Sequence, residues 1–181
     1  RNQWDRNGAR WFLVTVATGM VWVGGFLLFF LPVGTALREA AYLVGAVGAV
    51  ATISVFIVFI STYTETGLHR NPLIRVTLFG VTGACAALAA TNWGHGLLFS
   101  FTTVSEPFPH VAAERQPLFE GLLTLVRLPA FYATYLMIEH LLATRRRSRV
   151  QLLLFVVGAV AIAALDFASE YTALMPVEGA T

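Results

Sequence analysis

Long stretches without a charged residue alternate along this chain with short segments that are rich in arginine, proline and glycine. A helix that crosses about 30 Å of hydrocarbon needs about 20 mostly apolar residues. Five stretches reach that length, and they are too continuous to be strands of a membrane barrel, in which apolar and polar residues alternate. The pattern predicts five membrane-spanning helices, at about 11–31, 40–64, 75–100, 118–143 and 150–170.

Residues that end helices separate these stretches. Pro32 and Gly34 follow the first stretch, and Gly67 and Pro72 lie between the second and the third. The loop before the fourth stretch holds Pro107, Pro109 and Pro117. Because the sequence contains no internal repeat and no linker, we expect residues 1–181 to form a single transmembrane domain, an all-α bundle of five helices.

The distribution of arginine predicts the direction of the helices, because cytoplasmic flanks accumulate positive charge. Five spans place the N-terminus and the second and fourth loops on one side of the membrane. That side carries Arg1, Arg6, Arg10, Arg70, Arg75, Arg145, Arg146, Arg147 and Arg149. The other side carries only Arg38 and Arg115, while Arg127 lies within the fourth span. We therefore expect a protein of the plasma membrane with a cytoplasmic N-terminus.

The composition supports a lipid environment. Apolar residues make up 57% of the chain, charged residues 12%, and the mean hydropathy is +0.71, whereas soluble domains are about a quarter charged. The pI near 9.0 does not call for a nucleic-acid partner, because the basic residues flank apolar stretches. The single cysteine, Cys85, lies within such a stretch, which excludes a disulfide framework and a thiolate metal site.

Polar side chains at membrane depth are candidate sites, because each is costly there unless it is paired or hydrated. Six fall near the outer ends of the last three spans, and we call them the outer polar layer: Asn92, His95, Glu120, Arg127, Asp166 and Glu170. An ion pair of Arg127 with Asp166 or Glu170 would only lock helices together, whereas a pocket would bind a small ligand or a proton. Asp166 is the first choice as the partner of Arg127, because the two lie at similar depth.

Histidines raise the question of haem, which needs two imidazoles at one depth. His95 lies near the outer end of its span and His140 near the inner end, while His69 and His110 fall in loops. We therefore expect no cofactor. The sequence also offers no nucleophile with a base, and no metal-ligand cluster, so we expect no catalytic and no metal-binding residues. A haem- or quinone-binding electron-transfer anchor and a structural membrane subunit remain as alternatives.

Short motifs carry a family resemblance. The segment Thr91-Asn92-Trp93-Gly94-His95 is similar to a Thr-Asn-Pro-Leu-His motif, and Thr62-Tyr63-Thr64 with Gly67 to an Arg-Tyr-Thr-Gly motif in which Thr62 replaces the arginine. The fifth span opens with Arg149-Val150-Gln151, similar to an Arg-Gln-Ala-Leu-Leu entry, although Asp166 stands where the family has asparagine. The sequence thus resembles the N-terminal seven-transmembrane sensor region of archaeal and bacterial histidine kinases.

The resemblance implies that the five spans are helices two to six of a seven-helix bundle. A first helix is then expected upstream of Arg1 and a seventh beyond Thr181. The implied function is a signal-input module of a two-component system, which senses a small ligand, pH or the state of the membrane through the outer polar layer. The resemblance also implies a homodimer formed through the parent signalling protein, and a kinase domain that lies in that parent and not in this segment.

Overall fold

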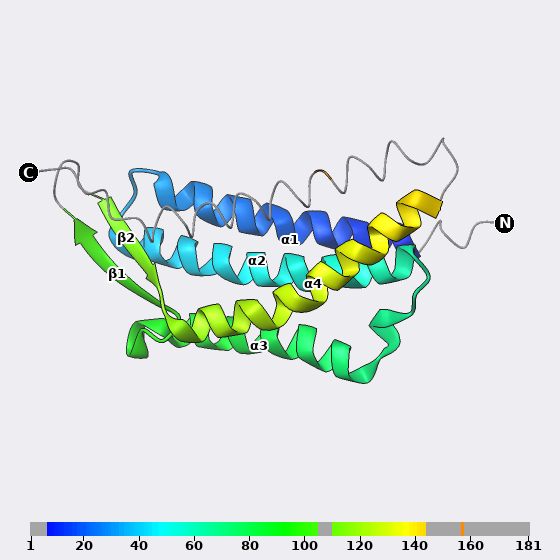
Figure 1. Cartoon of the computed structure of the whole chain (residues 1–181). Helices are drawn as coiled ribbons and strands as arrows, with labels where there is room; N and C mark the ends of the chain where they lie inside the picture. The colour runs from blue at the N-terminus through cyan, green and yellow to red at the C-terminus, as the bar shows by residue number, and fades with distance from the viewer. Residues whose placement is uncertain (1–6, 105–109, 144–156, 158–181) are drawn as a thin grey trace, which may run out of the picture. The chain divides into compact units, whose positions relative to one another are not determined.

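A computed structural model describes residues 7–104, 110–143 and 157 of the chain (Figure 1). Contacts divide the chain into two units, Arg1–Ala133 and Thr134–Thr181, so the last turns of the fourth long helix belong to the second unit. The elements in chain order are α1 (Asn7–Phe30), α2 (Thr35–Tyr63), the 3-10 turn η2 (Leu68–Arg70), α3 (Pro72–His95), β1 (Phe99–Val104), β2 (His110–Arg115) and α4 (Pro117–Ala143).

Four helices of the described part are long and apolar enough to cross a membrane, which confirms the first four predicted spans. They are Gly8–Phe30, Thr35–Tyr63, Pro72–His95 and Pro117–His140. The fifth predicted span, 150–170, lies outside the described residues. Every described span is helical, as expected of a multi-pass membrane protein, and the apolar side chains exposed on α1 and α3 are suited to lipid.

Two boundaries differ from the predicted ones by five residues. Helix α2 begins at Thr35 and not near position 40, so Arg38 belongs to its first turns. The Arg38 Nε donates to the Phe29 carbonyl at 2.9 Å, and its guanidinium lies 5.7 Å from the centre of the Phe29 ring, which lets a charged residue cap the end of α1. Helix α3 ends at His95, so the prediction that this span continues to about 100 was wrong in its last residues.

A β-hairpin follows α3, and the sequence analysis did not predict it. Strands β1 and β2 are antiparallel, with Phe99 opposite Arg115 and Val104 opposite His110. The turn before them starts at Gly96, whose φ of 60° is left-handed and favours glycine. The hairpin lies at the end of the helices where α1 leads into α2 (Figure 1). The described part of the fold is therefore helical within its four spans and locally β between the third and the fourth.

Glycines bring α1 and α2 into close contact. A Cβ on Gly25 would lie 2.5 Å from the Gly45 backbone nitrogen, and one on Gly48 would lie 2.7 Å from the Trp22 nitrogen. Only a residue without a side chain permits such an approach, which is how small residues drive helix association in lipid. Ala41 and Gly45 of α2 thus lie on the face that contacts α1.

Helix α2 is the most buried of the four described spans: 61% of its most apolar segment is buried, against 22% in α3. It contacts α1, α3, η2 and β2. The hydroxyl of its buried Ser54 donates to the Leu78 carbonyl at 3.2 Å, and it also lies within hydrogen-bond distance, 3.0 Å, of the Thr82 hydroxyl. These contacts connect α2 to α3. Helix α2 therefore contacts both the hairpin, through β2, and the turn η2 before α3.

Candidate functional site

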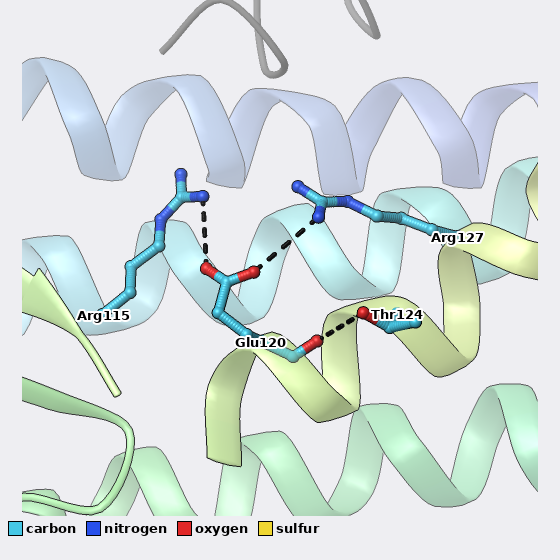
Figure 2. Close-up of polar contacts among 4 residues, drawn as sticks. All are labelled: Arg115, Glu120, Thr124 and Arg127. Carbon is cyan, nitrogen blue, oxygen red and sulfur yellow. Dashed lines mark hydrogen bonds and ion pairs between the residues drawn. The ribbon is translucent and has the colours of Figure 1, made fainter. Parts of the chain in front are cut away.

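Three charged side chains meet where β2 leads into α4. Arg115 is the last residue of β2, Glu120 lies in the first turn of α4, and Arg127 lies two turns further along the helix. Figure 2 shows the Glu120 carboxylate between the two guanidiniums, with one oxygen toward each. Arg115 Nη1 lies 3.5 Å from Glu120 Oε1, and Arg127 Nη1 lies 3.7 Å from Glu120 Oε2. We call these three side chains the Arg–Glu–Arg cluster.

The side chain of Arg127 extends along α4 toward the hairpin end of the helix (Figure 2). A long side chain can in this way keep its charge near the membrane surface while its backbone lies deeper. One partner of this residue is Glu120, on the same helix. The predicted pair of Arg127 with Asp166, and the placement of Glu170, lie outside the described residues and stay predictions.

The contacts within the Arg–Glu–Arg cluster are loose. Charge-assisted hydrogen bonds between nitrogen and oxygen are usually about 2.7–2.9 Å long, shorter than both distances here. The side chains are between 22% and 37% exposed, so solvent screens them, and exposed pairs of this kind contribute about 1 kcal/mol or less. The contacts of Glu120 with the two arginines therefore contribute little to stability.

Tyr42 of α2 joins the Arg–Glu–Arg cluster to an aromatic cluster. Its hydroxyl interacts electrostatically with the Arg115 guanidinium. Its ring centroid lies 5.0 Å from those of Phe29 and Phe99 and 5.8 Å from that of Phe101. Sequence reasoning missed Tyr42 and Arg115, although a tyrosine within an apolar span and an arginine five residues before Glu120 were visible signals.

Asn92 is 3% exposed, and its side chain holds the turn between α3 and β1. Its Oδ1 accepts from the backbone N–H of Leu98 at 3.0 Å and of Phe99 at 3.3 Å, and its Nδ2 donates to the Phe99 carbonyl at 2.9 Å. Its own carbonyl accepts from the Gly96 N–H at 2.7 Å. Asn92 thus positions the strand that carries Phe99 and Phe101.

His95 is exposed and bonds within its own segment. Its Nδ1 accepts from the Leu97 N–H at 3.0 Å, so a neutral ring carries its proton on Nε2, which lies 3.0 Å from the Thr91 hydroxyl oxygen. That hydroxyl in turn donates to the Ala87 carbonyl at 3.0 Å. Of the outer polar layer, the structure therefore brings Glu120 and Arg127 together and places Asn92 and His95 at the nearby end of α3.

A second polar contact lies at the other end of α2. The Ser61 hydroxyl oxygen accepts from the His69 backbone N–H at 2.9 Å and lies 2.9 Å from Nδ1 of the same histidine. Burial, followed by the positive charges of Arg70 and Arg75, lowers the pKa of His69 from its ordinary value. A neutral His69 accepts the Ser61 proton, so this contact fixes the loop between α2 and α3.

The comparisons with known proteins give one family. A family model described as the N-terminal 7TM region of histidine kinase matches residues 1–179, which covers almost the entire chain. No curated protein and no solved structure matches it. The family match rests on the sequence as a whole, and it agrees with the resemblance of the Thr91–His95 segment.

Proposed function

Because the chain belongs to the family of N-terminal 7TM regions of histidine kinases, we propose that the hairpin end of its helices receives the signal. The family identifies the chain as the sensory input module of a signal-transduction protein that crosses the membrane several times. Such a module is a non-catalytic input domain. The outer polar layer, with Asp166 and Glu170 as further members beside Glu120 and Arg127, binds the stimulus.

The observation that carries this proposal is the loose Arg–Glu–Arg cluster and its connections. Arg115 belongs to the hairpin and contacts Tyr42 of α2, while Glu120 and Arg127 belong to α4. A ligand that exchanges these weak contacts for stronger ones favours one arrangement of α4 relative to α2 over another. Small helix displacements of this kind are a general way in which membrane receptors pass signals inward.

The arginine asymmetry supports the orientation. Arg70 and Arg75, near η2, belong to the strongly basic side, whereas the hairpin carries Arg115 alone. Under the positive-inside rule the hairpin end faces outward and the N-terminus is cytoplasmic. The plasma membrane is then the site of action, and dimerisation through the parent kinase brings two such modules together.

The test measures autophosphorylation of the parent histidine kinase in membrane vesicles, because basal output can be read without knowing the stimulus. Glu120→Gln removes the carboxylate charge from the Arg–Glu–Arg cluster while keeping its shape, so we expect basal autophosphorylation to change several-fold. Glu114→Gln is the matched control, because Glu114 is exposed on β2 and lies outside the cluster. Equal output from wild type and both variants would show that the cluster is not part of the input.

A double variant tests whether Arg127 and Asp166 act as a pair. Arg127→Leu together with Asp166→Leu should fold nearly as well as wild type, while each single change should fold less well because it leaves one charge in the membrane without a partner. In the parent kinase the folded double variant should lose its response. Two single variants as stable as wild type would show that these residues do not meet.

A further inference from the structure

We infer that Arg70 and Arg75 bind the phosphate group of an anionic phospholipid, whose acyl chains pack along the exposed apolar residues at the start of α3. Arg70 is the last residue of η2, and Arg75 lies in the first turns of α3. We call these two side chains the basic pair. They lie at the opposite end of α3 from the hairpin, so the inference goes beyond the proposed function and does not depend on it.

The guanidiniums of the basic pair are accessible, since both arginines are exposed. Their hydrogen bonds come from the backbone: the Arg70 N–H donates to the Gly67 carbonyl at 2.8 Å, and the Arg75 N–H donates to the Asn71 carbonyl at 3.1 Å. Within the described residues, the ion pairs involve other arginines and neither member of the basic pair. Each guanidinium therefore keeps its side-chain N–H donors for a ligand.

The two positive charges of the basic pair lie near the same side chain. Burial first, and then the charges of Arg70 and Arg75, lower the pKa of His69, so both guanidiniums are close to this imidazole. An anion beside them offsets the repulsion between the two like charges. The positive end of the α3 dipole acts in the same direction. Asn71 already accepts the Leu73 N–H at 3.0 Å, so the guanidiniums are the donors that an anion meets.

The apolar surface beside the basic pair indicates that the anion belongs to a lipid. Leu73 is 75% exposed and Val76 is 72% exposed, and residues three apart lie on one face of a helix. The opposite face of α3 is buried and includes Leu78, which is bonded to Ser54 of α2. A phospholipid presents a phosphate at the membrane surface and acyl chains directly below it. It therefore matches the two arginines and the two apolar side chains together, whereas a soluble anion matches the arginines alone.

The charge of the headgroup sets the expected preference. A guanidinium binds phosphate oxygens through parallel N–H donors, and every phospholipid offers such oxygens. Phosphatidylcholine carries a compensating positive charge, whereas phosphatidylglycerol does not. Attraction to an anionic membrane surface amounts to about fivefold in affinity for each basic residue. We therefore expect the basic pair to prefer phosphatidylglycerol over phosphatidylcholine by about tenfold or more.

The experiment titrates the protein with all 181 residues, in micelles of an uncharged detergent, with either lipid at matched chain length. Native mass spectrometry counts the bound lipid molecules. Arg70→Gln and Arg75→Gln should each reduce the preference for phosphatidylglycerol about fivefold, and the double variant should bind both lipids alike. Arg70→Lys and Arg75→Lys keep the charge but lose the planar fork, so their preference should lie between wild type and the glutamine variants.

Arg10→Gln is the matched control, because it removes the same charge at the same end of the helices. Arg10 is exposed on α1, two residues before Phe12, whose ring centroid lies 5.9 Å from that of Phe59 of α2. This variant should keep the lipid preference of wild type. Melting temperatures without added lipid should be equal for wild type and all variants, because the substituted side chains are exposed, so a lost preference then reports binding and not folding.

Three results would overturn the inference. Equal affinity of wild type for both lipids would show that the charge of the headgroup is not recognised. An equal loss in Arg10→Gln and Arg70→Gln would show attraction by net charge without a site. Competition by glycerol 1-phosphate as strong as by the intact lipid would show a soluble anion in place of a lipid. The kinase assay on Glu120→Gln is independent of all three, so this inference and the proposed function can fail separately.

Discussion

Replacing Asn92 by alanine should be among the most damaging single changes at the hairpin end. The side chain is buried and makes three hydrogen bonds to the backbone of Leu98 and Phe99, which are themselves 0% and 1% exposed. After the change, the Leu98 N–H and the Phe99 carbonyl lose partners at 3.0 and 2.9 Å without access to water. Each buried group left unsatisfied costs about 1–3 kcal/mol, so the expected loss is about 2–6 kcal/mol.

Asn71→Ala is the matched control for this prediction. Asn71 caps the start of α3, where its Oδ1 accepts from the Leu73 N–H at 3.0 Å in an exposed position, and loss of such a cap costs about 1 kcal/mol. The free energy of unfolding in mixed detergent micelles, followed by circular dichroism, measures both variants. Equal losses for the two would show that Asn92 does not hold the turn, and would refute the account of the hairpin.

Two further predictions concern the rest of the first unit. Gly25→Ala should destabilise the protein by about 1–3 kcal/mol, because its Cβ would meet the α2 backbone. Gly24→Ala is the control and should not destabilise it, because no atom lies within 4 Å of a Cβ at that position. Equal melting temperatures for the two variants would contradict the close contact of α1 and α2. Because the pKa of His69 is lowered by folding, the folded state favours the neutral ring and its contact with Ser61, so stability should fall as pH drops through about 6.5. The free energy of unfolding, measured above and below that pH, should depend less on pH in His69→Gln than in wild type. An unchanged pH profile in this variant would count against the contact of His69 with Ser61.

The spans were predictable because length and hydropathy determine them almost alone. The hairpin was not, since the apolar residues Leu97 to Phe99 continue the hydropathy of α3 and a single glycine, Gly96, marks the end of the helix. A left-handed residue at that position reverses the chain, and Asn92 supplies the hydrogen bonds that the turn requires. The hydrogen bonds of one side chain, Asn92, therefore decide the conformation of this turn, and the periodicity of apolar residues does not reveal them.

The pairs of the polar layer depend on how far each side chain reaches, which the sequence does not give. Depth along the helices predicts a pair of Arg127 with Asp166, which lies outside the described residues and stays a prediction, whereas the reach of the arginine side chain brings its guanidinium to Glu120 two turns away. Arg115 entered the sequence argument only as a loop charge. Its role depends on the hairpin, which carries it back to the start of α4.

The central claim is that the hairpin end is the outward-facing input side of a membrane sensor. Thr102 of β1 and Thr66 of the loop after α2 are both exposed and provide matched positions for cysteine labelling, in a background where Cys85 is replaced by serine. With a membrane-impermeant maleimide applied to intact cells, Thr102→Cys should be labelled and Thr66→Cys should react only after the membrane is opened. The reverse pattern would place the Arg–Glu–Arg cluster on the cytoplasmic side and contradict the account.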